Sequence, residues 1–528
     1  MAVNQGRGAV TGLLLVLGSA LYLYPFVRVL WRIGDEGTIV YGAQLVAAGA
    51  LPFRDFFEEI GPGSFYWLGL FFKVFGTHWP VARGLLLVTG AATVLLMYGL
   101  TRRLDRSRWA VLPAAFYLAL SIPVWPALSH HWDSNLWALL AVAVFCLWQD
   151  RGKRVYLPLT GVMAGITACF MQTKGLFLFL GLLAALVITD YQGKERKRGI
   201  CPDLGLLTLG FAGVGGMVLV FFYVNRGLAD LVYANLVWPL ERYRQVNILP
   251  YGYFLWEVMA PQLKIFFNRL FSPPGAKACA VVSMIPFYLI FVLPGLLAAA
   301  IAGCSINRSK RAMLLSSGTL TYIILGAAIW VSELHRQDIY HLIAGAPLLL
   351  IISLVLLKEC LSEKRVAYGL VMGALTLGFV CCSAAHMANA LAANQVMATR
   401  RGNVHCFAKD EALDFLLRKT RPGEEVFIYP YYPLYYFLAE VKNPTRYGHL
   451  IYHLHTEAQF QEVTRDLEKK KVKYVLMDTF VGGENLRFWF PNYQHPEDDN
   501  LMVEQYLHEH YLVIGEKNKF KILQRLEN

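Results

Sequence analysis

The 528-residue chain is poor in charged residues and lacks the motifs of several common enzyme classes. Asp, Glu, Lys and Arg make up 16% of it, against about one quarter in an average soluble domain, which excludes a purely soluble globular protein. There is no P-loop, no GxGxxG fingerprint and no GxSxG elbow, so ATP or nucleotide-sugar chemistry has no support. The 14% aromatic content excludes a disordered chain.

Cysteine pairs are also missing. The nine cysteines include no CxxC pair, and only Cys406 lies in the polar C-terminal part, which therefore cannot contain a disulfide of its own. A cleavable signal peptide is not expected, because the first apolar run, residues 10–31, is too long and lacks a small-x-small cleavage site. We expect this run to be a retained transmembrane helix.

The excess positive charge is confined to the apolar part of the chain. Residues 1–389 contain 31 Lys+Arg and 18 Asp+Glu, and residues 390–528 contain 18 and 19. A nucleic-acid-binding protein would carry its basic residues on a polar domain, and the polar domain here has almost no net charge. The distribution instead indicates a membrane protein with a basic cytoplasmic face and no nucleic-acid partner.

Eleven apolar segments can each cross, or nearly cross, a hydrocarbon core that needs about 17–25 residues. They are residues 9–31, 81–100, 109–128, 135–149, 156–172, 176–189, 204–224, 278–303, 313–332, 342–357 and 367–387. Basic clusters at residues 102–108, 151–154, 194–198, 308–311 and 358–365 occupy alternate loops. These loops and the N-terminus are therefore predicted to be cytoplasmic, and the odd number of spans puts the C-terminal part outside the cell membrane.

The predicted fold class is mainly α: a polytopic transmembrane helix bundle of about 11 spans with a small C-terminal α/β extracytoplasmic domain. Residues 1–389 form the membrane domain, with a first outer loop at 34–80, and residues 390–528 form the soluble domain. The outer loop contains an amphipathic helix around residues 39–47 and an apolar stretch at 65–75 that is expected to lie in the membrane interface. In the soluble domain we expect helices at 411–417 and 456–470 and strands at 425–429 and 472–477.

Acidic residues at the outer ends of spans are the first candidates for chemistry. Asp35 and Glu36 follow the first span directly, and two adjacent carboxylates at a membrane surface repel unless one finds a partner or is protonated. Asp133 opens the fourth span on the same side. The structural alternative for both Asp35 and Asp133 is a helix N-cap.

Cations on the outer side form the second set of candidates. Lys174 is the only charged residue between Arg154 and Asp190, so it needs an anionic partner unless it extends to the membrane surface. The sequence offers Asp35, Glu36 or Asp133 as that partner, or a substrate phosphate. The polar loop 333–341 adds His335, Arg336 and Tyr340, and cations that meet carboxylates at an outer surface suit a phosphate-bearing lipid.

A metal centre does not follow from the sequence. His130, His131, His335 and His341 are predicted to lie on the outer side, and their spacing matches no zinc motif. We therefore assign no metal ligands and no certain cofactor, and leave a divalent metal open.

In combination these features resemble the polytopic GT-C glycosyltransferases, and within them the branch of the lipid A aminoarabinose transferase and the protein O-mannosyltransferase-like (family 39-type) enzymes. The matching pieces, in chain order, are Gly34-Asp35-Glu36, residues 51–58, Gly61-Pro62, Asp133, residues 171–175, residues 336–347, residues 420–423 and residues 432–436. Two departures are visible: Glu58-Glu59-Ile60 replaces a common lysine before the proline, and the loop near Arg242 lacks a histidine that some relatives carry.

The resemblance implies a polyprenyl-phosphate-linked sugar donor and transfer on the outer face of the cell (inner) membrane to a lipid, glycan or protein acceptor. It implies that Asp35, with Glu36 beside it, is the catalytic carboxylate, that Asp133 is a second acidic site residue and that Lys174 contacts the donor phosphate. Arg54, Arg242, His335, Arg336 and Tyr340 complete the expected substrate-binding set.

Two other functions fit the sequence less well. A lipid or polysaccharide transporter would need two gated faces and often shows inverted repeats with broken helices; the sequence shows neither. A non-catalytic envelope scaffold would not account for Lys174 or for the paired carboxylates.

Overall fold

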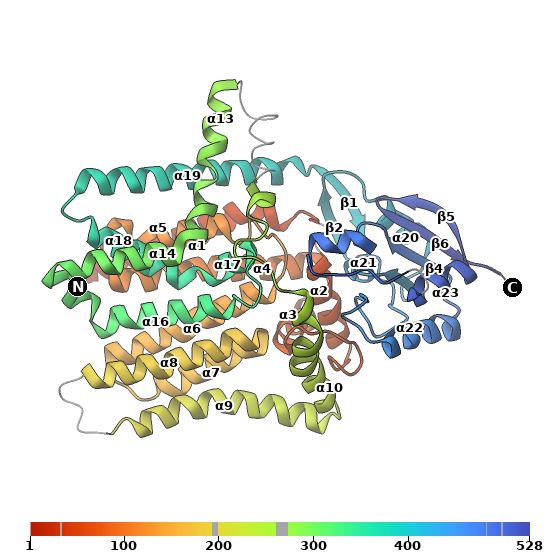
Figure 1. Ribbon diagram of the computed structural model, residues 1–528, viewed down its shortest axis with the longest axis horizontal. Helices are drawn as coiled ribbons and strands as arrows, with labels where there is room; N and C mark the ends of the chain where they lie inside the picture. The colour runs from red at the N-terminus through yellow and green to blue at the C-terminus, as the bar shows by residue number, and fades with distance from the viewer. Residues whose placement is uncertain are drawn as a thin grey trace.

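The computed structural model describes residues 2–31, 34–192, 199–259, 273–481, 483–497 and 500–527. Long helices form a bundle at one end of the molecule, and a small α/β domain lies at the other end (Figure 1). The N-terminus lies at the end of the bundle that faces away from the α/β domain (Figure 1). The predicted fold class, a mainly α bundle with a small C-terminal α/β domain, is confirmed.

Each of the eleven apolar segments falls on one helix or on two consecutive helices. These are α1 (Ala2–Val27), α4 (Trp79–Leu104), η1 with α5 (Arg108–Val111, Leu112–Leu120), α6 (His130–Arg151), α7 (Tyr156–Phe170), α8 (Gln172–Gln192), α9 (Cys201–Val224), α13 with α14 (Pro273–Val282, Ile285–Ile306), α15 with α16 (Arg308–Leu314, Ser317–Ser332), α17 with α18 (Ile339–Gly345, Pro347–Cys360) and α19 (Arg365–Ala392). Among the described residues, six helices are long and apolar enough to cross a membrane, and up to eight spans result if the two bent pairs count. The eleven predicted spans include helices that are too short for this criterion, such as α7 with 15 residues.

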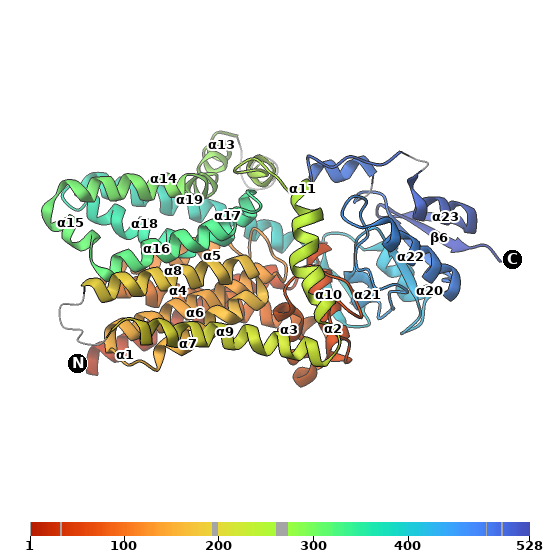
Figure 2. The same ribbon diagram turned by 60° about the horizontal axis from the view of Figure 1, so that its bottom comes forward.

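The described basic loops, at residues 102–108, 151–154, 308–311 and 358–365, lie at the end of the bundle opposite the α/β domain (Figures 1 and 2). Ion pairs connect the ends of different helices there: Arg103 to Asp150 at 2.8 Å and Lys358 to Asp105 at 2.7 Å. The predicted basic cluster at residues 194–198 lies outside the described residues.

Short elements lie between the bundle and the α/β domain (Figures 1 and 2). They are α2 (Gly34–Ala47), α3 (Pro62–Phe75), α10 (Leu228–Val232), the π-helical turns η2 (Tyr233–Val237) and η3 (Pro239–Tyr243), and α11 (Arg244–Val246). Helix α2 buries Ile39, Val40, Ala43 and Val46, but the residues between them are buried or half-buried as well. The predicted amphipathic character is therefore wrong, because packing encloses α2 on nearly all sides and leaves only Asp35 exposed. Helix α3 covers the apolar stretch predicted at 65–75.

The C-terminal domain contains a hairpin, a four-stranded sheet and flanking helices. Its elements are β1 (Gln395–Thr399), β2 (Gly402–Cys406), α20 (Glu411–Lys419), β3 (Val426–Tyr429), α21 (Leu434–Leu438), α22 (Glu457–Lys470), β4 (Tyr474–Asp478), η5 (Gly483–Phe488), α23 (Met502–His510), β5 (Tyr511–Lys517) and β6 (Phe520–Arg525). The sheet order is β3-β4-β6-β5, with β3 parallel to β4 and the other pairs antiparallel. The two helices and two strands expected from the sequence are confirmed, and α22 begins with a capping box between Thr456 and Gln459.

The two parts of the chain are joined closely at α2 and the loop that follows it. The backbone N–H of Phe57 donates to the carbonyl of Arg446 at 2.7 Å. Gly37 lies so close to the C-terminal domain that a Cβ there would be 2.2 Å from the backbone nitrogen of Leu434. This contact fixes the first turn of α2, with its two acidic residues, against the C-terminal domain.

Candidate active site at the domain junction

Asp35 lies in the first turn of α2 and is exposed at the junction with the C-terminal domain. Its Oδ1 accepts a hydrogen bond of 2.6 Å from the hydroxyl of Tyr431. A Cβ at Gly34 would lie 2.5 Å from the Tyr431 ring, so glycine is needed for this approach. The N-terminus of a helix favours a carboxylate, and the hydrogen bond holds this one in place at the surface.

His449 lies between two further carboxylates next to Asp35. Its Nδ1 is 3.5 Å from Glu58 Oε2, and its Nε2 is 3.6 Å from Glu59 Oε2. Burial raises the pKa of Glu58 to about 7. Burial opposes the charged form of His449, but Glu59, Glu58 and Asp35 together raise its pKa to about 9. The Tyr431 and His449 rings are 5.6 Å apart. We call Asp35, Glu58, Glu59, Tyr431 and His449 the junction site.

Tyr243, at the end of η3, connects the junction site with the loop 333–341. Burial raises the pKa of its phenol, Arg336 lowers it, and Glu59 and Asp35 raise it further, so the phenol lies within electrostatic range of all three. Arg336 is 8% exposed and donates to Asp338 Oδ2 at 2.6 Å. Arg336, which was expected to bind substrate, therefore lies near the junction site but already forms an ion pair with Asp338.

Lys174 belongs to a second polar cluster, at the end of the bundle near the C-terminal domain. Its Nζ lies 2.7 Å from Glu333 Oε1, and neither side chain is exposed. It also donates to Ser134 Oγ at 2.9 Å and to Asn135 Oδ1 at 2.6 Å. These three contacts use all three donors of the ammonium group. The partner is Glu333, which is none of the three acidic residues that the sequence suggested, and the geometry favours charge neutralisation over a phosphate contact.

Glu36 has a different environment from its neighbour Asp35. It is fully buried, its Oε2 is 2.7 Å from an Arg83 nitrogen, and its Oε1 accepts from the backbone N–H of Leu128 at 3.0 Å. Arg83 also donates to the carbonyl of Val29. This contact links α2 to α4, which gives Glu36 a structural role. The repulsion expected between adjacent carboxylates is relieved because Glu36 turns inward.

Asp133 and Arg54 also lie outside the junction site. Asp133 is buried and accepts from the Thr89 hydroxyl at 3.3 Å. The N-cap of α6 is Ser129, so the capping alternative for Asp133 is wrong. Arg54 is bound to Asp55 by two hydrogen bonds of 2.7 and 2.8 Å.

The remaining three expected residues are spread around the loop 333–341 and η3. Arg242 is half-buried on η3, and His335 is exposed. The Tyr340 ring packs against Trp125, with the ring centroids 4.6 Å apart. Within the described ranges, no contact joins these three side chains to the junction site.

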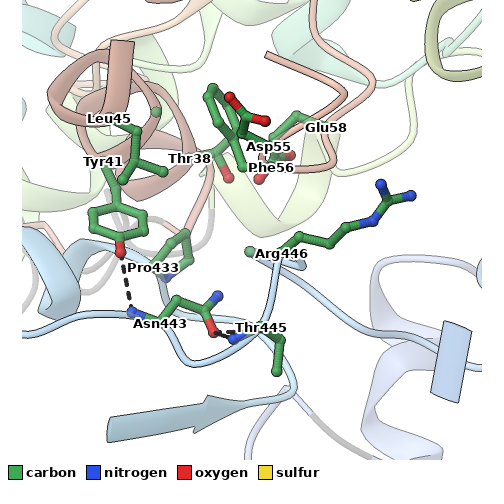
Figure 3. A pocket seen from close by; sticks show the side chains of 12 residues that line it. Thr38, Tyr41, Leu45, Asp55, Phe56, Glu58, Pro433, Asn443, Thr445 and Arg446 are labelled. Carbon is green, nitrogen blue, oxygen red and sulfur yellow. Dashed lines mark hydrogen bonds between the residues drawn. The ribbon is translucent and has the colours of Figure 1, made fainter. Parts of the chain in front are cut away.

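A cavity of about 110 Å³ opens beside the junction site, between α2 and residues 443–448 (Figure 3). Glu58 lines this cavity and also contacts His449. Thr38, Asn443 and Thr445 also line it. The volume equals that of about four water molecules, so the cavity has room for a small polar group next to Glu58.

Sequence reasoning missed four of the five residues of the junction site as functional candidates. Glu58 and Glu59 had a signal, because they are adjacent carboxylates in the first outer loop. Glu58 ends the matching piece 51–58, and both residues belong to the departure at 58–60, but neither was predicted to be a site residue. Tyr431 and His449 had no local signal, since they lie about 400 residues after Asp35 and meet it only through the fold.

Two groups of side chains in the described part of the chain bring three potential metal-ligand atoms within 4.8 Å of one another: Glu58, Glu59 and His449, and His131, Glu333 and His341. In the first group the two ring nitrogens of His449 face different carboxylates. One ion cannot bind both nitrogens, whereas a protonated imidazole can pair with both carboxylates at once.

Comparison with known proteins supports the fold. Residues 60–215 match the family model described as dolichyl-phosphate-mannose-protein mannosyltransferase. The chain is similar to ArnT from Cupriavidus metallidurans bound to undecaprenyl phosphate, with 12% identity, a TM-score of 0.52 and coverage of 99% of this chain and 98% of that one. No curated protein matches the chain.

It is also similar to the archaeal oligosaccharyltransferase AglB from Archaeoglobus fulgidus in complex with an inhibitory peptide and a dolichol-phosphate. The identity is 13%, the TM-score 0.51, and the coverage 89% of this chain and 69% of that one. The resemblance to the GT-C glycosyltransferases is thereby confirmed in the fold and in the family match over residues 60–215.

Proposed function

We propose that this chain is an integral-membrane glycosyltransferase that moves a sugar from a polyprenyl-phosphate donor to a hydroxyl acceptor. The observation that carries the proposal is the exposed Asp35 carboxylate, held by Tyr431 at the junction of the two domains in a chain with this fold. The family match over residues 60–215 and the polyprenyl phosphates named for the similar structures support the donor class.

The reaction would be a single displacement at the anomeric carbon. Asp35 would orient the acceptor hydroxyl and accept its proton as the new glycosidic bond forms, and the polyprenyl phosphate would leave with the electrons of the broken bond. Tyr431 would keep the Asp35 carboxylate aimed at the acceptor. Arg336 and the protonated His449 are already paired with carboxylates, so they would act on the leaving phosphate through their electrostatic potential and not by direct contact. Lys174 would act indirectly, because Glu333, Ser134 and Asn135 occupy its donors.

The experiment compares the envelope glycans of a deletion strain that expresses the wild type, Asp35→Asn or Glu241→Gln, analysed by mass spectrometry. Glu241 is an exposed carboxylate on η3 and is the matched control. Loss of a general base lowers a rate by about 10²–10⁴. We therefore expect the product to be lost with Asp35→Asn and restored by Glu241→Gln. Full restoration by Asp35→Asn, at wild-type protein level, would refute the proposed role of Asp35.

We infer the same orientation as the charge pattern predicts, with the C-terminal domain outside the cell membrane. The termini lie at opposite ends of the molecule, and the basic loops lie at the N-terminal end (Figure 1). Alkaline phosphatase fused after Asn528 should be active, and a fluorescent protein that matures only in the cytoplasm should stay dark there. A bright cytoplasmic signal would show that the C-terminal domain lies in the cytoplasm. It would therefore refute the proposed active site on the outer face of the membrane.

A further inference from the structure

Two histidines and a glutamate that are distant in the sequence meet at the end of the bundle nearest the C-terminal domain. His131 lies in the first turn of α6, Glu333 directly follows α16, and His341 lies in the first turn of α17. One ligand atom of each lies within 4.8 Å of the others. Glu333 is fully buried, and the two histidine side chains are 14% and 15% exposed. We propose that His131, Glu333 and His341 form a binding site for a divalent transition-metal ion of the zinc type.

The spacing of the three ligands fits such an ion. In a tetrahedral site with bonds of about 2.0–2.2 Å, neighbouring ligand atoms lie roughly 3.3–3.5 Å apart. His131 Nδ1 and Glu333 Oε2 are 3.1 Å apart, and the remaining ligand atoms need to move by an ångström or so at most. Two imidazoles and one carboxylate favour Zn²⁺ over Mg²⁺ and leave a fourth position open.

The surroundings orient one of the ligands, His341. Asp338 Oδ1 accepts from Nδ1 of His341 at 2.8 Å and from its backbone N–H at 3.0 Å. This carboxylate–histidine contact leaves the other ring nitrogen, Nε2, as the metal ligand. Arg336 fixes Asp338 from its other side at 2.6 Å. The imidazole of His341 is therefore oriented before any ion binds.

One carboxylate oxygen of Glu333, Oε2, is available for a metal ion. Lys174 binds Oε1 at 2.7 Å, whereas Oε2 has no hydrogen bond of normal geometry to any residue in the described part of the chain. A buried carboxylate oxygen without a hydrogen bond is destabilising, and a cation next to it would remove that penalty. The Oε2 atom points to the same space as His131.

The charges around the proposed metal site indicate which further ligand the metal ion would bind. Lys174 with Glu333 and Arg336 with Asp338 form two neutral pairs. A divalent ion would leave an excess of two positive charges in a largely buried place. Its open position should therefore take an anionic oxygen, from hydroxide or from a phosphate group.

The proposal is tested on the purified full-length protein in detergent. After treatment with a chelator, the protein is equilibrated with Zn²⁺, and the metal content and the X-ray absorption spectrum of the zinc are measured. We expect one zinc per chain with two imidazole nitrogens in its first shell. Binding of no zinc, or a spectrum with a single imidazole, would overturn the proposal, because the Glu58, Glu59 and His449 group can supply only one. This measurement uses the wild type, so it does not depend on whether a variant folds.

Variants then identify the ligands. His131→Ala and His341→Ala should each abolish stoichiometric zinc binding, and Asp338→Asn should weaken it about 10–100-fold. The matched control is His335→Ala, whose ring lies 5.2 Å from that of His341 but is not in the group. Loss of zinc in His449→Ala, with retention in a folded His341→Ala, would contradict the proposal. Metal content is independent of transferase activity, so failure here leaves the proposed function untouched.

Discussion

Replacing Lys174 with Met should destabilise the fold, because it would leave the Glu333 carboxylate buried without its cation. Neither side chain of the pair is exposed, and the ion pair is 2.7 Å long. Removing one partner of a buried pair costs about 3–5 kcal/mol. Met retains most of the volume of the lysine side chain, so little of the loss should come from an empty space.

The free energy of unfolding can be measured by titration with SDS in mixed micelles, with helix content as the signal. Lys174→Met should unfold at clearly lower SDS than the wild type. The double variant Lys174→Met with Glu333→Gln should recover much of the loss, since replacing both charges by neutral groups is often close to neutral. Lys73→Met, at an exposed lysine of α3, is the matched control and should change little.

A different result would support the phosphate role that the family resemblance implies for Lys174. In that case Lys174→Met would leave unfolding unchanged and would weaken the stabilisation by added polyprenyl phosphate, by about 1.5–3 kcal/mol for a lost charge-assisted contact. Unchanged unfolding together with unchanged stabilisation by the lipid would refute both roles.

Three further outcomes follow from the structure. Glu36→Gln should lower stability by about 3–5 kcal/mol in the same SDS titration, because Arg83 would lose its buried partner; a variant with normal stability and no product would instead indicate a catalytic Glu36. Thermal stability should fall as the pH rises from about 5 to 9, since the folded state raises the pKa of Glu58 from 4.5 to about 7 and that of His449 from 6.5 to about 9, so both favour folding in their protonated forms. His449→Asn should flatten the upper part of that profile, and an unchanged slope between pH 7 and 9 would contradict the assignment. Gly37→Ala should separate α2 from the C-terminal domain, because a Cβ meets backbone at 2.2 Å; limited proteolysis at wild-type rates would show that the contact is not essential.

The helices and their approximate ends could be predicted from the sequence, because the requirement to bury backbone polar groups and expose apolar side chains to lipid is local. All eleven apolar segments became helices, and the α/β character of the C-terminal domain followed from periodicity and turn residues. The hairpin β1–β2, helix α23 and the strands β5 and β6 were not predicted.

The acidic and basic residues at span ends could also be picked out, since charge is rare in an apolar chain. The residues with which they pair could not be predicted from the sequence. Asp35 and Glu36 are adjacent in sequence, yet one is exposed beside Tyr431 and the other is buried against Arg83. Successive residues of a helix point about 100° apart, and which of the two faces the core depends on packing with elements far along the chain.

What the sequence determined by itself was a membrane-embedded helix bundle with a polar C-terminal domain and a set of unusual polar residues, because each of these depends on composition and short spacing. The tertiary structure decided which of those residues meet. Lys174 pairs with Glu333 across about 160 positions, His449 reaches Glu58 from the other domain, and His131 meets His341 although their spacing matches no metal motif. Such groups form only when helices pack at particular angles and depths, and that packing is a property of the whole chain.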